Sequence, residues 1–447
     1  MENVFTSKCI DIDYEGNGVC KIDGFPVFVP GCLTDELVRF EIVKKNKNFA
    51  NGKLLEILEP SPFRAVPKCS NYEKCGGCSL MNLEYSKQLE YKKHIVSDTL
   101  KRIGKIDTVI NDCIGMDNPY YYRNNVQVPF SYNDKIIAGF YESKTHNVVD
   151  SSECFISNQL VKKMIDYIKQ LFIRYRITIY NESNKKGSIK HVVFRNNMKQ
   201  DFMVIFVTKT PYLNHEKEIC EDLIKRFKNV KSIVHNINEE DTSVVLGRSN
   251  RIIYGDGIIL DVLEGNRFEI GPNTFYQVNS MQMKKLYNKA ISYANISSDD
   301  VIIDAYCGIG TISLLAAKQA KKVYGIEIVK ESIENANKNK IANNVSNVEF
   351  YCGPAEKLIY DIIKKDHIDA LIVDPPRKGC ELSFLDCVLN CNIKRIVYVS
   401  CNVRTLSRDL NYLSKKYDVI EVTPVDMFPH TVHVECVVTL SLRNSKE

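Results

Sequence analysis

The chain has 447 residues, of which 44% are hydrophobic and 26% are charged, and its formal net charge is +5. This length predicts two to four domains, and the composition excludes a disordered chain, a collagen-like chain and a small disulfide-stabilised protein. The net charge is too small to identify a polyanionic partner on its own. We see neither a secretory signal nor an apolar run long enough to span a membrane, so we expect a cytoplasmic protein without membrane contact.

Residues 1–60 alternate polar and apolar side chains on a period of two, and glycines interrupt the alternation. Short strands separated by turns predict a small, OB-like β-barrel. Lys44, Lys45 and Lys47 lie close to Phe49, a combination that suits phosphates and stacked bases. Taken alone, however, this patch would be better explained as a solvated, lysine-rich loop.

Residues 61–270 begin in a proline-rich linker and mix strands, as at 202–207, with helical stretches, as at 160–171. This mixture predicts a central α+β domain. The segment 85–103 has helical periodicity and many lysines. We expect part of 81–112 to pack on the C-terminal domain.

Residues 271–447 alternate apolar strands with helices, and three of the strand segments end in an acidic residue. Buried strands joined by helices predict a Rossmann-like α/β sheet that binds its ligands at the carboxyl ends of the strands. A final alternating stretch, 433–442, predicts a closing antiparallel strand.

The first strand of this region runs into a glycine-rich turn, Asp304-Ala305-Tyr306-Cys307-Gly308-Ile309-Gly310-Thr311. Glycines let the backbone approach a ligand closely at the N-terminus of the following helix. Glu327, at the end of the next strand, is placed to accept hydrogen bonds from ribose hydroxyls. The third glycine of the pyrophosphate fingerprint is missing, which favours S-adenosylmethionine over NAD. A mere tight turn would show the same two glycines.

Three further residues stand where strands of the same region end or begin. Asp374, fixed by two prolines, suits hydrogen bonds to a planar ring, although such an Asp also serves as a helix cap. Cys401 precedes a helix that carries Arg404 and Arg408, so we expect a lowered thiol pKa and a nucleophile; a structural cysteine is the alternative. Glu435 lies in apolar sequence, where burial would raise its pKa toward that of a general base; the alternative is a solvent-facing strand residue.

The chain has 16 cysteines. Without a secretory route, clustered cysteines indicate metal ligands or nucleophiles rather than disulfides. We expect cysteines that stand alone among apolar residues, such as Cys9, to be buried hydrophobes. Cys69, Cys75 and Cys78 crowd together, and Cys154 is the plausible fourth ligand. From spacing alone, a zinc site and an iron–sulfur cluster are about equally supported.

Together these motifs resemble the RNA uracil-5-methyltransferases, in particular the branch that modifies 23S ribosomal RNA and carries an N-terminal TRAM domain and an iron–sulfur cluster. The resemblance covers essentially the whole chain. It rests on these patterns: Gly16-Asn17-Gly18-Val19 with Val27-Phe28-Val29-Pro30-Gly31, Cys69 with Cys75-Gly76-Gly77-Cys78, Phe275-Tyr276-Gln277-Val278-Asn279, the glycine-rich turn, Asp374-Pro375-Pro376-Arg377, Ser400-Cys401-Asn402 and His433-Val434-Glu435.

The resemblance implies that a methyl group passes from S-adenosylmethionine to C5 of a uridine in 23S ribosomal RNA. Cys401 would form a covalent bond to C6 of the base, and Glu435 would remove the C5 proton. Contacts to the cofactor and the target base are implied for Gln277, Tyr306, Thr311, Glu327 and Asp374. RNA contacts are implied for Phe275, Arg123 and Asn124. A [4Fe-4S] cluster is implied on Cys69, Cys75, Cys78 and Cys154, with zinc as the less favoured alternative.

Three positions depart from the family pattern. Val403 replaces a proline and Asn125 replaces a lysine. Pro354 stands where an Asp or Asn often contacts adenine, so no adenine contact is inferred there. The alternative functions are a tRNA uracil-5-methyltransferase, a methyltransferase for exocyclic base amines, which needs no cysteine nucleophile, and a non-catalytic RNA-binding protein. No obligate protein partner is expected.

Overall fold

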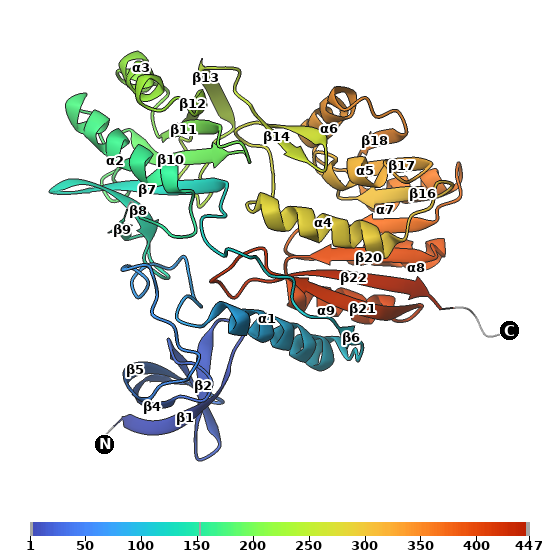
Figure 1. Ribbon diagram of the computed structural model, residues 1–447, viewed down its shortest axis with the longest axis horizontal. Helices are drawn as coiled ribbons and strands as arrows, with labels where there is room; N and C mark the ends of the chain where they lie inside the picture. The colour runs from blue at the N-terminus through green and yellow to red at the C-terminus, as the bar shows by residue number, and fades with distance from the viewer. Residues whose placement is uncertain (1–2, 152, 444–447) are drawn as a thin grey trace.

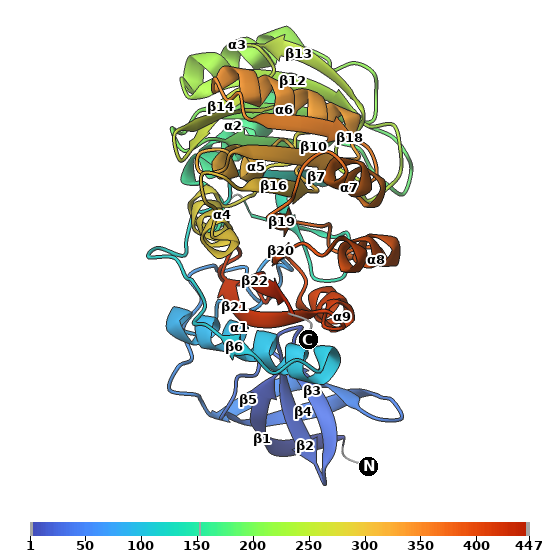
Figure 2. The ribbon, with the colours of Figure 1, turned by 90° about the vertical axis from the view of Figure 1, so that its right-hand side faces the viewer.

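A computed structural model describes residues 3–151 and 153–443 of the chain. It contains a small N-terminal barrel, a central sheet and a larger C-terminal sheet (Figure 1). Helix α1 (Tyr85–Thr99) lies between the barrel and the C-terminal sheet in both views (Figures 1 and 2). No helix in this part of the chain is both long and apolar enough to cross a membrane.

The N-terminal barrel is closed, with the strand order β1-β2-β3-β5-β4, so the predicted β-barrel is present. Its strands are β1 (Val4–Ile12), β2 (Asn17–Ile22), β3 (Phe25–Pro30), β4 (Leu37–Lys45) and β5 (Ala50–Glu59). Cys9 is buried as expected, but it packs on Cys20 and Cys32, and the three sulfur atoms lie within 4.8 Å of one another. Gly18 leaves room for them, because a Cβ there would lie 2.8 Å from the Cys9 sulfur.

The central region is built on a seven-stranded, mostly antiparallel sheet with the order β13-β12-β11-β10-β7-β8-β9. Its strands are β7 (Asn125–Asn133), β8 (Lys135–Tyr141), β9 (Val148–Asp150), β10 (Ile189–Asn196), β11 (Phe202–Thr208), β12 (Val230–Ile237) and β13 (Ser249–Tyr254). Helices α2 (Gln159–Arg174) and α3 (Glu216–Arg226) share one apolar core with this sheet, through residues such as Ile165 and Leu223.

A two-stranded hairpin, β14 (Ile259–Leu263) and β15 (Asn266–Ile270), connects the central and C-terminal regions. It packs on the C-terminal region, where the backbone N–H of Glu269 donates to Oδ1 of Asn339 at 3.1 Å. The hairpin therefore belongs structurally with the C-terminal sheet, although it precedes the predicted boundary at residue 271.

The C-terminal sheet has eight strands in the order β18-β17-β16-β19-β20-β22-β21-β6. The first five are mutually parallel, and β22 runs antiparallel to both β20 and β21. The strands are β6 (Val109–Ile110), β16 (Val301–Ala305), β17 (Lys322–Glu327), β18 (Val348–Cys352), β19 (Ala370–Val373), β20 (Arg395–Ser400), β21 (Tyr417–Val425) and β22 (Glu435–Leu442). This order is the predicted doubly wound sheet, and its direction of winding reverses between β16 and β19, where such sheets bind ligands.

Helices cover both faces of the C-terminal sheet. They are α4 (Ser280–Ala294), α5 (Thr311–Ala316), α6 (Lys330–Ala342), α7 (Ala355–Ile363), α8 (Leu382–Cys391) and α9 (Val403–Leu413). Figure 2 shows α4 on one side of the sheet and α8 and α9 on the other. Two separate apolar cores fill these two interfaces.

The segment after α1 joins the C-terminal sheet. A π-helical turn (Leu100–Gly104) packs on α9, and β6 (Val109–Ile110) pairs with β21 at the edge of the sheet. Val96 and Leu100 are buried in the same core as α9. Helix α1 is therefore part of the scaffold of the C-terminal region, although the barrel and the cysteine motif precede it in the chain.

Candidate active site

A thiol and two carboxyl groups lie at the ends of three neighbouring strands. Ser400 pairs with Cys436 in the antiparallel β20–β22 ladder. The next residues outward, Cys401 and Glu435, therefore lie opposite each other across the two strands. Asp374 follows directly on β19, the next strand of the sheet. The register thus gathers the predicted nucleophile, the predicted base and the predicted ring-binding acid at one edge.

Of the two carboxyl groups in this cluster, Glu435 is buried and Asp374 is half-buried. Burial raises the pKa of Glu435 to about 8; Asp374 raises it further, and Arg377 opposes the rise. Burial alone raises the pKa of Asp374 to about 7. The expected rise in the Glu435 pKa is thus confirmed. Two ionised carboxylates this close would repel each other, so near neutral pH the pair retains protons.

The thiol of Cys401 has a raised pKa, not the lowered one that its place at a helix N-terminus predicts. Burial raises the pKa to about 11, with further contributions from Glu435 and Asp374, and Arg377 acts in the opposite direction. The sequence-based expectation is wrong because it left out the burial of the thiol, which is the largest cause, and these two carboxylates. In the free protein the sulfur is therefore protonated at neutral pH, and a neighbouring base must accept its proton when it reacts.

The two arginines expected to activate Cys401 have other partners. Nε of Arg408 donates to Oδ1 of Asp409 at 2.8 Å. The guanidinium group of Arg404 lies over the ring of Tyr14, 4.9 Å from its centroid. Arg377, from the loop after β19, is the cation that acts on the cluster. Arg377 lowers the pKa values of both Cys401 and Glu435, a role that its place in the Asp-Pro-Pro-Arg motif does not predict.

The glycine-rich turn lies beside this cluster, at the end of β16. Tyr306, Gly308 and Gly310 all adopt positive φ angles, of 66°, 54° and 82°. A Cβ on Gly310 would lie 2.6 Å from the ring of Phe350, so this position requires glycine. Gly308 has open space where its Cβ would be, and its N–H donates to Oε2 of Glu327 at 3.2 Å. The turn therefore leaves backbone open to a ligand next to the predicted ribose-binding acid.

A third acid and a buried tyrosine complete the polar lining. Asp304 accepts a hydrogen bond from Oγ of Ser313 at 2.6 Å, and burial raises its pKa to about 7. Tyr287 on α4 has a pKa well above its ordinary value because of burial and the nearby Asp374, with smaller contributions from Glu435 and Asp304. Tyr287 thus faces three acids of the site. Its sequence context, one tyrosine in an amphipathic helix, predicts only core packing.

The remaining residues with a predicted cofactor or base contact differ in exposure. Gln277 and Thr311 are buried, and Gln277 lies beside Tyr287. Phe275, two residues before Gln277, is 73% exposed. An exposed aromatic ring next to a buried polar cluster is available to stack on an incoming base.

The two residues with predicted RNA contacts in the central region lie in different surroundings. Asn124 is buried, and its Nδ2 donates to the backbone oxygen of Gln277 at 2.9 Å and to Oγ of Ser280 at 2.8 Å. Its side chain therefore ties the central region to the start of α4. Arg123 instead lines a cavity together with the cysteine motif. RNA contact by either residue stays a prediction.

Cys69, Cys75, Cys78 and Cys154 line one cavity of about 320 Å³. The structure thus brings the distant fourth cysteine to the other three. Burial raises the pKa of Cys78, and Cys154, Cys75 and Cys69 raise it further, whereas Arg123 lowers it. All four cysteines lie in the described part of the chain, yet no three of their sulfur atoms lie within 4.8 Å of one another.

Comparison with known sequences shows strong and nearly full-length similarity. The sequence profile of the tRNA (Uracil-5-)-methyltransferase family matches residues 84–443. An uncharacterized RNA methyltransferase of Oceanobacillus iheyensis is 43% identical over 99% of this chain and 97% of its own length. An uncharacterized RNA methyltransferase of Staphylococcus aureus strain N315 is 42% identical over 99% of this chain and 98% of its own length.

Comparison with solved structures shows a similar fold over almost the entire chain. The crystal structure of the tRNA (uracil-54, C5)-methyltransferase of Pyrococcus abyssi, in complex with S-adenosyl-L-homocysteine, superposes with a TM-score of 0.80 at 27% identity. The match covers 98% of this chain and 100% of that protein. It therefore includes the N-terminal barrel as well as the two sheets.

Proposed function

The chain belongs to the tRNA (uracil-5-)-methyltransferase family, and from this premise we propose that it methylates C5 of a specific uridine in 23S ribosomal RNA. Its activity is that of an S-adenosylmethionine-dependent RNA (uracil-5-)-methyltransferase. The observation that carries the proposed mechanism is the position of Cys401 opposite Glu435, beside the glycine-rich turn. With RNA as its substrate, the enzyme would work in the cytoplasm.

In the proposed mechanism, Cys401 is the nucleophile. Its thiol gives up its proton to a neighbouring carboxylate, and the sulfur attacks C6 of the uracil. The C5–C6 double bond opens, and electron density moves to C5 and O4. S-adenosylmethionine, when bound, supplies an electrophilic methyl group that C5 accepts. Asp374, with a pKa of about 7, would accept the thiol proton, so that the carboxylate of Glu435 stays free to act as the base in the second half of the reaction.

Glu435 acts as the base of the second half of the reaction. Its carboxylate removes the proton from the methylated C5, and the electron pair of that C–H bond restores the C5–C6 double bond. The bond between C6 and the sulfur of Cys401 breaks as this double bond forms, and the departing thiolate recovers its proton from Asp374. The base must differ from the nucleophile, because the nucleophile is still bonded to C6 when the C5 proton leaves. A carboxyl with a pKa of about 8 is well matched to proton transfer near neutral pH.

The cofactor would bind between the glycine-rich turn and the acids at the neighbouring strand ends. We assign the ribose contact to Glu327, whose Oε2 accepts the N–H of Gly308 and whose Oε1 accepts the N–H groups of Ile328 and Val329. Tyr306, Thr311, Gln277 and Asp374 would complete the sites for the cofactor and the target base. Pro354 precedes α7 and offers no polar side chain, so the adenine contact must come from elsewhere.

The target uridine would enter beside the exposed ring of Phe275. A paired uridine must leave its stack to reach C6 and C5, so loops are the favoured substrates. Arg123 and Asn124 are proposed to lie near the bound RNA, with Asn124 acting through the segment that carries Gln277. The lysine-rich side of the barrel is proposed to contact phosphates.

The choice of 23S ribosomal RNA rests on the resemblance to the branch that carries both the barrel and the cysteine motif. A tRNA uridine is the second candidate. The Pyrococcus abyssi protein, named for a tRNA uridine, matches this chain over 98% of its length. The barrel alone therefore does not distinguish the two RNA classes. A methyltransferase for exocyclic amines is disfavoured, because that reaction needs neither Cys401 nor Glu435.

We propose that the cysteine cavity holds a [4Fe-4S] cluster on Cys69, Cys75, Cys78 and Cys154. A tetrahedral zinc site requires sulfur atoms about 3.8 Å apart, given zinc–sulfur bonds of about 2.3 Å. No three of these sulfur atoms lie within 4.8 Å of one another, and we favour a cluster over zinc because of the family resemblance and because a cluster's own atoms separate its ligands. Methyl transfer needs no electron, so the proposed role is to order the cavity and the adjacent RNA-binding segments.

We expect Cys401→Ala to lower methylation to less than about one thousandth of the wild-type rate, because no adduct at C6 forms. It should also form no covalent complex with RNA that contains 5-fluorouridine. The wild-type enzyme should form this covalent complex, since the base cannot remove fluorine from C5 and the adduct persists.

Glu435→Gln should slow product formation about 10²–10⁴-fold and should accumulate the adduct on ordinary uridine. Denaturing gels measure both complexes.

The matched control for these variants is Cys391→Ala, which removes a half-buried thiol on α8. It should retain wild-type activity and adduct formation. Full methylation by Cys401→Ala would contradict the proposed mechanism and would favour the exocyclic-amine alternative.

The RNA target is tested by mapping 5-methyluridine in a strain that lacks this enzyme. We expect mass spectrometry to show the loss of 5-methyluridine at one or more positions of 23S ribosomal RNA, with tRNA unchanged. Re-expression of the wild-type enzyme should restore the modification, and Cys401→Ala should not. A loss confined to tRNA would refute the ribosomal assignment and leave the chemistry intact.

The metal content tests the proposed cluster. After anaerobic purification, we expect about four iron atoms and four sulfides per chain, and Cys78→Ser should lose both. The matched control is Cys220→Ser, because Cys220 is a buried cysteine on α3, outside the cavity. One zinc per chain without iron would overturn the cluster in favour of zinc.

A further inference from the structure

The loop between β21 and β22, residues 426–434, leads directly into Glu435. We name it the base loop. It contains no strand of its own, and His430 within it adopts a positive φ of 66°. Such a backbone conformation is unfavourable for a residue with a side chain and persists only where surrounding contacts hold it. Strand pairing holds Glu435 from the side of β22, and the contacts of the base loop hold it from the side that precedes the strand.

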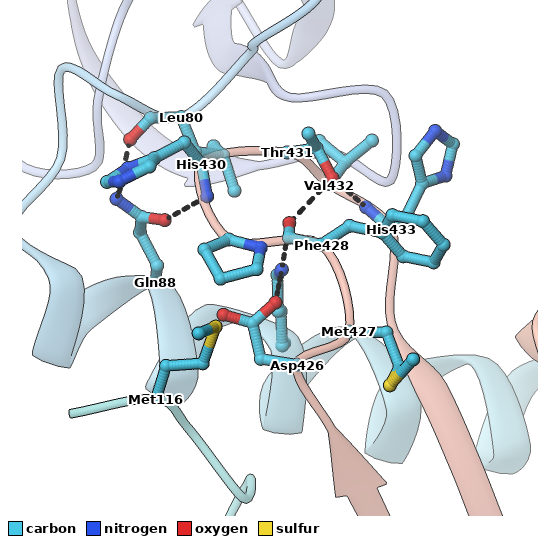
Figure 3. Close-up of polar contacts among 12 residues, drawn as sticks. Leu80, Gln88, Met116, Asp426, Met427, Phe428, His430, Thr431, Val432 and His433 are labelled. Carbon is cyan, nitrogen blue, oxygen red and sulfur yellow. Dashed lines mark hydrogen bonds and ion pairs between the residues drawn. The ribbon is translucent and has the colours of Figure 1, made fainter. Parts of the chain in front are cut away.

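Gln88 of α1 makes the most direct side-chain contacts to the base loop (Figure 3). Its Oε1 accepts the backbone N–H of His430 at 2.9 Å, and its Nε2 lies 3.1 Å from Nδ1 of the same residue. The same Nε2 donates to the backbone oxygens of Leu80 at 2.9 Å and Leu83 at 2.8 Å. Gln88 is fully buried. One side chain thus joins the base loop to the segment that follows the cysteine motif.

A second side chain of α1 holds the start of the base loop. Lys92 and Asp426 form an ion pair in which both side chains are fully buried. Nζ of Lys92 also donates to the backbone oxygen of Phe428 at 3.1 Å. The hydroxyl of Tyr85 donates to Oδ2 of Asp426 at 2.8 Å. Separating a buried ion pair leaves an uncompensated buried charge, which costs free energy. Movement of the base loop away from Lys92 is therefore unfavourable.

The residues next to Cys78 hold the middle of the base loop. The backbone N–H groups of Ser79 and Leu80 donate to the oxygen of His430, at 2.9 and 3.0 Å. Oγ of Ser79 accepts the N–H of Val432 at 3.1 Å. On another side of the loop, the hydroxyl of Tyr122 donates to the oxygen of Pro429 at 3.1 Å. Ser79, the residue directly after Cys78, therefore connects the cysteine cavity to the base loop through hydrogen bonds.

We propose that Gln88 is a positioning residue for Glu435: it fixes the base loop between α1 and the segment after Cys78, and so holds the base over the reacting C5. The inference rests on the proposed role of Glu435. An error of about 1 Å in the position of a catalytic group can cost about 10²-fold in rate. Through the same contacts, the order of the cysteine cavity affects the position of the base that removes the C5 proton, and no electron transfer is needed.

The test compares Gln88→Leu with wild type on RNA that contains ordinary uridine, with a labelled methyl group on S-adenosylmethionine. RNA from a strain that lacks the enzyme is the substrate. We expect release of methylated RNA to fall about tenfold or more, while the first attack by Cys401 changes less than about twofold. The fraction of enzyme trapped as a methylated covalent adduct should therefore rise severalfold. Tyr122→Phe, which removes only the hydroxyl bonded to Pro429, should shift the same ratio to a smaller extent.

The matched control is Lys93→Ala, which removes an exposed side chain on the same helix, paired with the exposed Asp112. It should leave the ratio of adduct to product unchanged. The proposal is overturned if Gln88→Leu and Tyr122→Phe leave this ratio at the wild-type value, whether both rates stay the same or fall equally. A wild-type enzyme that forms no adduct on any RNA would instead refute the proposed function itself.

Discussion

The pairing of β20 with β22 is the constraint on which the site depends. The antiparallel ladder sets Ser400 against Cys436, and thereby sets Cys401 against Glu435, two residues from separate sequence motifs. A shift of one residue in this register would turn the side chains of one strand to the other face of the sheet. The two groups would then no longer share a pocket. Packing on both faces of the sheet, by α4 on one side and by α8 and α9 on the other, holds this register in place.

The same packing that fixes the register also sets the proton chemistry. Asp304 and Glu435 are buried and Asp374 is half-buried within one site, and the loss of solvent raises each pKa into the range from about 7 to about 8. Isolated buried charges are costly, so the free enzyme lowers its buried charge by holding protons. The thiol of Cys401 is likewise held in its protonated form. In the proposed mechanism, the nucleophile is therefore protonated in the free enzyme and needs a base to accept its proton.

Much of this arrangement could be predicted from the sequence, because strand ends of a doubly wound sheet converge. The acids and the cysteine at those ends were recognisable as a site, and the barrel followed from its period-two pattern. The predicted direction of the thiol pKa is wrong, because a helix N-terminus and two arginines are visible in sequence, whereas the burial of the thiol and its closeness to Glu435 arise only through the fold. For Tyr287 and Gln88, the sequence predicts no more than their places on helices, and their roles become visible only in the fold.

The central claim is that Cys401 and Glu435 share one buried pocket, and alkylation of Cys401 tests it most directly. The rate of its reaction with iodoacetamide can be followed against pH by peptide mass spectrometry, in wild type and in Glu435→Gln. The account predicts an apparent thiol pKa near the value of about 11 in wild type, and a lower one in the variant, because one of the carboxylates that raise it is gone. Identical pH profiles for the two proteins would contradict the account.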